Sequence, residues 1–282
     1  MIIKYLLVFI LFCSTLNAKS KNVYVKNIKI GSKINVYLIN KNLYDITVLY
    51  NARTESLIST NDLPMEVTVH ARTKKLINSY LVKGRRYTIN SIFKYTIGSK
   101  YSIHDDTYLY RLPYKLGTSK MVTQSFNGYF SHKGNSRFAV DFGMKIGTKI
   151  YAARGGIVVA TKSDGSKSGN RKYIKDANFI LIRHNDGTYA KYAHLRKRGV
   201  RVKIGQKVKR GKFIGYSGNT GYTNGPHLHF IVFKGKSHNQ RDSIPIKFIS
   251  TRGVIYKPIR GNKYKAVKLQ QIKRRINNGL YK

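Results

Sequence analysis

The chain has 282 residues, and its 54 Lys and Arg outnumber its 11 Asp and Glu to give a formal net charge of +43. Its length and its hydrophobic content of 41% are sufficient for one large core or two smaller ones, and they exclude a disordered chain and a multi-span membrane protein. Because acidic residues are scarce, any chemistry that needs a carboxylate must use one of only eleven side chains.

The basic residues are spread over the whole chain and are denser after residue 250. The positive electrostatic field of these residues attracts polyanions, which for an exported protein include anionic wall polymers and lipopolysaccharide. A lysine-rich surface that is simply solvated explains the composition equally well, and both interpretations stay open. No nucleic-acid-binding motif accompanies the charge, so we expect no specific nucleic-acid partner.

Residues 1–18, MIIKYLLVFILFCSTLNA, have the pattern of an export signal: Lys4 gives a basic start, residues 5–12 are apolar, and Ala18 is a small residue suited to cleavage. The apolar run is short for a transmembrane helix, although an uncleaved anchor is the alternative. Cleavage at Ala18 would remove Cys13, the single cysteine. We therefore predict an exported protein, periplasmic, associated with the cell envelope or secreted.

Residues 19–115 contain short runs in which apolar and polar residues alternate, among them NVYVKNIKI, DITVLYN and RRYTINSIFKYTI. This pattern predicts an antiparallel β-sandwich-like module. Near its end, His104, Asp105 and Asp106 are close enough in sequence to suggest a metal site. A turn is the preferred interpretation, because adjacent side chains rarely converge on one ion.

Residues 121–250 form short β-prone segments separated by glycine-containing turns, with a hairpin expected at Asp186 and Gly187. The pattern predicts a second all-β domain, in which residues 163–176 are a surface loop and His184 has a structural role at the hairpin. Residues 251–282 have weak periodicity, and we predict a basic C-terminal tail there.

The run NGPHLHFIVF, residues 224–233, is apolar except for two histidines. Side chains two apart on a strand share a face, so His227 and His229 should point together. They suit two metal ligands, one ligand and one catalytic base, or two exposed histidines on an edge strand. The run alone does not decide between these.

Three other residues favour a metal centre. Asp141 lies in the apolar run FAVDF, where a carboxylate is costly to bury unless it is paired or metal-bound. His132 precedes it, and His194 ends the segment YAKYAH. Two His and one Asp are a suitable ligand set for zinc that leaves a fourth position for water, and two further imidazoles beside it can take and return protons.

Four segments in succession resemble the lysostaphin/LytM-type zinc peptidases, which cut peptide links in peptidoglycan. They are FSHKGNSRFAVDFGMKIGTKIYAARGGIV, DGTYAKYAHL, VKIGQKVKRGKFIGYSGNTG and GPHLHF. The resemblance covers about residues 121–234, and the flanking HDDTYLYRLPY and IPIKF resemble a subgroup of this family with an N-terminal β-module.

The resemblance implies an exported endopeptidase that hydrolyses peptide cross-links of peptidoglycan in an open groove, with a metal-bound water as nucleophile. One Zn²⁺ would be held by His132, Asp141 and His229, while His194 and His227 would be catalytic. The commonest family pattern has histidine four residues before the aspartate. Here Arg137 occupies that position and His132 stands nine residues before Asp141, a distance that the subgroup also uses.

The alternative is a weakly active or inactive family member that activates other cell-wall hydrolases, and Arg137 is the one feature that suggests it. In either case we expect peptidoglycan peptides to be the partner. The resemblance leaves two bonds open: a cross-link between D-Ala and a diamino acid, or a glycine bridge.

Overall fold

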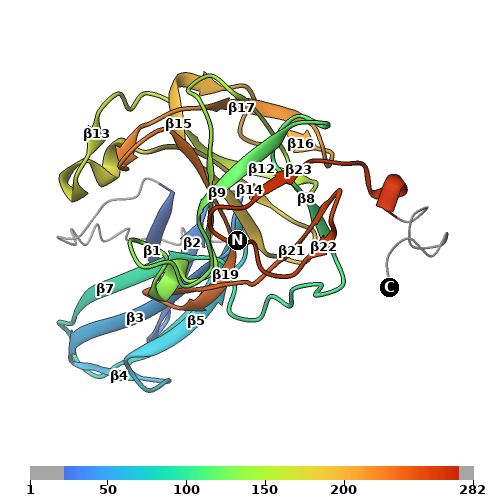
Figure 1. The fold of residues 1–282 in the computed structure, drawn as a ribbon. Helices are drawn as coiled ribbons and strands as arrows, with labels where there is room; N and C mark the ends of the chain where they lie inside the picture. Colours follow the sequence, from blue (N-terminus) through green and yellow to red (C-terminus); the bar gives the residue numbers. More distant parts are fainter. Residues whose placement is uncertain (1–21, 273–282) are drawn as a thin grey trace. The chain divides into compact units, whose positions relative to one another are not determined.

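The computed structural model describes residues 22–272, so the export signal predicted over residues 1–18 lies outside the described part of the chain. The described residues divide into two compact units, 22–101 with 235–241 and 102–234 with 242–272. Within them, no helix is both long and apolar enough to cross a membrane. Each unit is a β structure with its own hydrophobic core (Figure 1).

The first unit contains two antiparallel sheets, with strand orders β1-β2-β6-β4 and β5-β3-β7. Its strands are β1 (Val23–Ile30), β2 (Lys33–Asn40), β3 (Ile46–Glu55), β4 (Leu57–Ser59), β5 (Met65–Val69), β6 (Thr73–Val82) and β7 (Thr88–Ile97).

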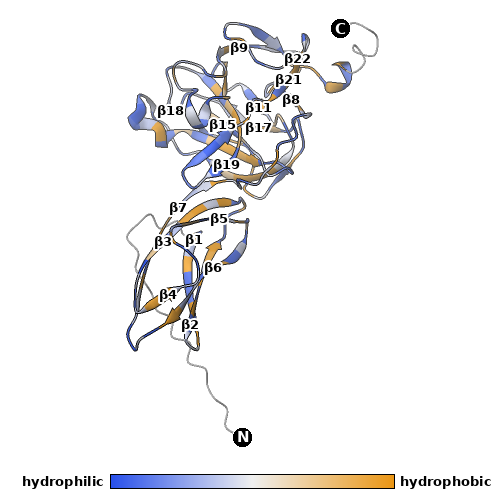
Figure 2. Ribbon diagram, turned by 90° about the horizontal axis from the view of Figure 1, so that it is seen from below, coloured by the Kyte–Doolittle hydropathy of each residue, from blue (hydrophilic) through white to orange (hydrophobic). Residues whose placement is uncertain are grey.

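Alternation of side chains explains these sheets. Along β2 every second side chain is buried, with Ile34, Val36 and Leu38 turned into the core. They form one hydrophobic cluster with residues of the other sheet, including Val48 and Tyr50 of β3. Figure 2 shows hydrophobic stretches on the strands of this unit. Two sheets that share one core form a sandwich, so the predicted β-sandwich-like architecture is confirmed.

The second unit is built on a large antiparallel sheet with the strand order β16-β12-β14-β15-β19-β10-β9-β23. Its elements up to residue 200 are β8 (Leu109–Arg111), β9 (Ser119–Gln124), the 3₁₀ helix η1 (Gly134–Ser136), β10 (Val140–Gly143), β11 (Lys149–Tyr151), β12 (Gly156–Lys162), β13 (Ser168–Gly169), the 3₁₀ helix η2 (Arg171–Asp176), β14 (Asn178–Arg183) and β15 (Tyr189–Val200). The remaining strands are β16 (Lys207–Val208), β17 (Phe213–Ser217), β18 (Gly221–Tyr222), β19 (His227–Ser237), β20 (Gln240–Ser243), β21 (Lys247–Ser250), β22 (Gly253–Ile255) and β23 (Lys263–Lys265).

One face of this sheet carries the core of the second unit. Leu228, Phe230 and Val232 of β19 alternate into it, together with Val140 and Phe142 of β10. The intervening residues of the same strands face the other way, and the histidines of β19 are among them. A continuous core under these two adjacent strands therefore gives the opposite face a rigid platform.

The structure differs from the predicted organisation in two segments. Residues 251–282, expected to be a basic tail, contain β22 and β23, and β23 pairs with β9 in the large sheet. The buried Ile255 and Tyr264 join the core, but strands of three residues are too short to show a period in the sequence. Residues 163–176, expected to be a loop, include β13, which pairs with β18, and η2.

Candidate active site

The site begins with a row of three side chains across β9, β10 and β19. Asp141 of β10 lies opposite His229 of β19 on one side and opposite Gln124 of β9 on the other. His229 Nδ1 is 2.8 Å from Asp141 Oδ1, and the Gln124 amide donates to Asp141 Oδ2 at 3.0 Å. Both carboxylate oxygens thus have a defined partner, and the alternation of each strand keeps this row on the face away from the core.

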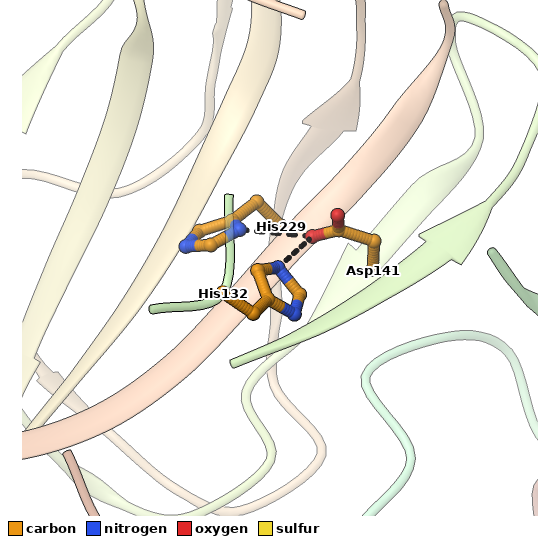
Figure 3. Close-up of side chains that lie close together, drawn as sticks. All are labelled: His132, Asp141 and His229. Carbon is orange, nitrogen blue, oxygen red and sulfur yellow. Dashed lines mark hydrogen bonds and ion pairs between the residues drawn. The ribbon is translucent and has the colours of Figure 1, made fainter. Parts of the chain in front are cut away.

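His132 reaches the row from the loop between β9 and β10. Its side chain is fully buried, its Nε2 is 3.2 Å from Asp141 Oδ1, and its Nδ1 is 2.8 Å from the Ser125 carbonyl oxygen. The loop is held by Gln124, whose side-chain oxygen accepts hydrogen bonds from the backbone N–H groups of Phe130 and Ser131. Figure 3 shows His132 and His229 converging on the same oxygen of Asp141.

The donor set fits a metal ion. One ligand atom from each of His132, Asp141 and His229 lies within 4.8 Å of the others. Because a carbonyl only accepts, the contact with Ser125 places the proton of a neutral His132 on Nδ1 and leaves a lone pair on Nε2. That Nε2 is buried without a hydrogen-bond partner among the described residues, and it faces a carboxylate oxygen. A cation between these two acceptors would satisfy both, and two nitrogens with one oxygen suit zinc.

The electrostatics of the row favour ligands in their metal-binding protonation states. Burial raises the pKa of Asp141, but its close contacts with His132 and His229 and the proximity of the other imidazoles outweigh burial and hold that pKa well below its usual range. Burial lowers the pKa of His229 in spite of its bond to Asp141. At neutral pH the carboxylate is therefore charged and the imidazole is neutral, as metal ligation requires.

Two more imidazoles stand beside the row. His227 lies two residues before His229 on the same face of β19, and its Nε2 is 3.8 Å from Asp141 Oδ1. The ring centroids of His194 and His227 are 4.7 Å apart, and those of His194 and His229 are 5.8 Å apart.

A β-bulge turns His194 toward this face. Ala193 pairs with both His229 and Phe179, and Leu195 pairs with Asn178, so His194 is an extra residue in β15. Regular alternation would point it into the core beside Tyr192. Its φ of 62° is instead in the left-handed region, which non-glycine residues rarely adopt. Bulges commonly re-aim side chains next to active sites.

Backbone carbonyls fix the tautomers of both histidines. His194 Nδ1 is 2.7 Å from the Thr220 oxygen, and His227 Nδ1 is 2.8 Å from the Gly225 oxygen. Each Nδ1 therefore carries a proton, which leaves Nε2 of the neutral ring as a proton acceptor. Burial, followed by the proximity of the other imidazoles, lowers the pKa of His194 to about 3, so its ring is neutral at physiological pH.

A groove of about 960 Å³ opens over these residues. Asp141, His194, His227 and His229 lie at its floor or wall, and aromatic rings border it. The ring centroids of Phe130 and Tyr222 are 5.4 Å apart. A cavity of this size with apolar walls and a few convergent polar groups is typical of a ligand site.

Arg137, at the position where the family usually has histidine, takes no part in the site. Its guanidinium is 3.6 Å from Asp242, stacks over the Phe138 ring, and is half exposed. Arg137 thus lies outside the candidate ligand set, and His132 approaches Asp141 from the preceding loop instead.

The remaining histidines of the second unit have structural contacts. His184 is buried at the β14–β15 hairpin, where its Nδ1 is 2.9 Å from the Thr188 hydroxyl, in agreement with its expected role. His104 is bonded to Asp106, whereas Asp105 accepts from Thr107, so these three neighbours form a turn and do not converge.

Gln124 is the site residue that sequence reasoning missed. It lies in MVTQSF, where nothing in the pattern distinguishes a glutamine that contacts a carboxylate from one that contacts water. The carbonyl groups of Thr220 and Gly225 were equally invisible, because every residue has one. Only strand pairing and loop closure bring these groups to the histidines.

Residues 135–241 match the sequence profile of Peptidase family M23. An uncharacterized metalloprotease of Buchnera aphidicola subsp. Baizongia pistaciae is 30% identical over 230 residues, which are 81% of this chain and 56% of that protein. Peptidoglycan DD-endopeptidase ShyA of Vibrio cholerae is 35% identical over 139 residues, 47% of this chain and 30% of ShyA. Lysostaphin of Staphylococcus simulans is 36% identical over 121 residues, 43% of this chain and 22% of lysostaphin. The chain thus spans about half the length of the first relative and less than a third of the other two.

Proposed function

We propose that this protein, which carries a domain of peptidase family M23, is an exported zinc-dependent endopeptidase that hydrolyses peptide cross-links of peptidoglycan. The observation that carries the proposal is the convergence of His132, Asp141 and His229 beside two further imidazoles, with Asp141, His229 and these two imidazoles lining one groove. Three relatives from Vibrio cholerae that are named peptidoglycan DD-endopeptidases support the substrate class.

His132, Asp141 and His229 would hold one zinc ion. When bound, zinc would act as a Lewis acid that lowers the pKa of a water ligand and polarises a carbonyl group. The three residues come from β10, β19 and a braced loop, so their positions are fixed before substrate arrives. A preorganised ligand set of this kind loses little conformational freedom on binding.

His194 and His227 would move the protons of the reaction. Each presents a free Nε2 while a backbone carbonyl holds Nδ1. Above its depressed pKa, His194 accepts a proton from the attacking water, and an imidazole so protonated returns the proton to the leaving amine. While Nε2 of either imidazole is protonated, its N–H group can also donate a hydrogen bond to the carbonyl oxygen of the substrate, which stabilises negative charge there.

Digestion of purified cross-linked muropeptides tests the proposal. The full mature chain, loaded with zinc, should release monomers with a new amine and a new carboxylate, and mass spectrometry of the products identifies the bond. A chelator should abolish cleavage and added zinc should restore it. A zinc-loaded protein that leaves every cross-link intact would contradict the proposal.

The second candidate is a non-enzymatic activator of other wall hydrolases. Arg137 was the sequence feature behind it, and the contacts of that side chain with Asp242 and Phe138 give it no support. A protein that activates a partner hydrolase equally well as parent and as His229→Ala would favour this candidate.

The strong positive charge supports a further proposed role in retention on anionic wall polymers or lipopolysaccharide. Attraction between exposed charges is screened within roughly 8–10 Å near physiological salt. Release of the protein from isolated walls should therefore rise with salt concentration, and retention that ignores salt would contradict it.

A further inference from the structure

Two cations line the groove beside the candidate metal site. Lys257 and Arg260 are the Lys and Arg residues of its lining, and both are exposed. Among the described residues, Asp141 is the one acidic residue that lines it, and its oxygens are already bound by His229 and Gln124. The groove therefore presents two positive charges that no carboxylate of its own lining neutralises.

The segment that carries these cations is fixed to the second unit. The Ser125 hydroxyl donates to the Pro258 carbonyl between them. The backbone N–H of Ile259 donates to the Tyr264 hydroxyl at 3.1 Å, and that of Gly261 donates to the Val122 carbonyl at 2.8 Å. The backbone that carries the two charges is thus anchored on β9 and β23, which preorganises it for a ligand.

Ser125 connects this segment to the candidate metal site. Its hydroxyl binds Pro258, and its carbonyl oxygen accepts from Nδ1 of His132. One residue therefore supports a ligand histidine on one side and the basic segment on the other. A peptide positioned for cleavage would pass close to both cations, because the same groove contains them all.

We propose that Lys257 and Arg260 form a subsite for a free carboxylate of the peptide substrate. The inference rests on the proposed function and extends it, because it selects substrates with an ionised carboxylate near the scissile bond. The guanidinium of Arg260 matches a carboxylate in a two-bond contact, and the ammonium of Lys257 adds a compact charge. The apolar and aromatic walls suit a peptide better than a phosphodiester polymer.

The comparison uses two muropeptide dimers that differ only in charge, one with free carboxylates and one with them converted to amides. The proteins are the zinc-loaded full chain and its Lys257→Gln, Arg260→Gln and double variants. Lys257→Arg and Arg260→Lys keep each charge. Lys263→Gln is the matched control, because Lys263 is exposed on β23 and does not line the groove. The dissociation constant of each dimer is measured as well as KM and kcat.

We expect each single loss of charge to raise KM for the free dimer roughly two- to fivefold, as for an exposed ion pair, and the double loss to raise it about tenfold. The kcat should stay within about twofold, because a contact made equally in the bound substrate and in the transition state changes KM and leaves kcat unchanged. The amidated dimer should respond to none of the substitutions, the charge-keeping variants should resemble the parent, and Lys263→Gln should change nothing.

Equal effects on the two dimers, or no effect on either, would overturn the subsite. The subsite would also be overturned if the variants are no longer retained on walls with phosphodiester polymers but have the KM and dissociation constants of the parent for both dimers. If the zinc-loaded parent cuts neither dimer, the proposed function fails. The dissociation constants then still test the subsite. The parent must bind the dimer with free carboxylates more tightly than the amidated dimer, and this difference must disappear in the double variant.

Discussion

Gln124 on β9 donates its side-chain amide to Oδ2 of Asp141 on β10 at 3.0 Å, while its side-chain oxygen accepts from the backbone of the loop that leads to His132. One neutral side chain thus orients one candidate metal ligand and braces the loop that carries another. Because the hydrogen bonds of Gln124 go to Asp141 and to this loop, its role is positioning.

Replacing Gln124 with alanine should weaken zinc binding by about 10- to 100-fold, the usual cost of losing a group that orients a ligand. Titration with a competing chelator measures this directly. Gln206→Ala is the control, because that glutamine accepts from Lys203 in a turn away from the site. An unchanged zinc affinity in Gln124→Ala would show that Asp141 and the loop are held without it.

Substitution of His132, Asp141 or His229 by alanine should remove zinc from the purified protein. Each substitution deletes one of the three proposed ligand atoms and leaves an incomplete site. Metal analysis should fall from about one ion per chain to near zero, and cleavage should fall with it. His238→Ala, outside the groove, should retain the metal. Full zinc content in His132→Ala would remove that residue from the ligand set.

His194→Ala and His227→Ala should keep zinc but lower kcat by about 10²- to 10⁴-fold, the range for loss of a general acid or base. The metal analysis separates this result from the loss of a ligand. A variant that loses both zinc and activity would place that histidine among the ligands instead.

Arg137→Ala should retain zinc and at least half of the parent activity, because the guanidinium contacts Asp242 and Phe138 and not the groove. Loss of the exposed ion pair should cost about 0.2–1 kcal/mol of stability. Cleavage and zinc content are measured together. A large fall in zinc affinity would contradict the assignment of His132 in its place.

Stability of the second unit should fall in acid through His184. Burial, and then the nearby charge of Arg154, lowers the pKa of this histidine to about 3, whereas an unfolded histidine titrates near 6.5. Between these values the unfolded state binds a proton that the folded state does not, so stability decreases as pH falls from about 6.5 toward 3. The slope is up to about 1.4 kcal/mol per pH unit.

Urea unfolding of the parent and of His184→Gln between pH 6.5 and 4.5, at one zinc concentration, measures this slope. Glutamine can still donate to Thr188 but does not titrate. Between pH 6.5 and 4.5 the variant should therefore lose about 2 kcal/mol less of its free energy of unfolding than the parent does. His70→Gln, whose ring is 70% exposed and lies in the first unit, is the matched control for the replacement of a histidine by glutamine. Parallel slopes in parent and His184→Gln would contradict the buried neutral ring.

Much of the architecture was predictable because side-chain alternation in a strand is local. The alternation of residues 33–40 predicts a half-buried strand, and the strand β2 is there. The short strands of residues 251–265 were not predictable, because three residues do not define a period and their partners lie far away in sequence. The same limit concealed β13 and its pairing with β18.

The sequence by itself singled out the candidate site residues: an aspartate in an apolar run, two histidines with strand spacing, and two more in segments that resemble a known family. Their spacing decided that His227 and His229 share a face, because that geometry needs only one strand. Tertiary structure decided the rest. The pairing of β9, β10 and β19 brought Gln124, Asp141 and His229 into one row. A bulge turned His194 out of the core, because an unpaired residue reverses the alternation that the sequence would otherwise impose.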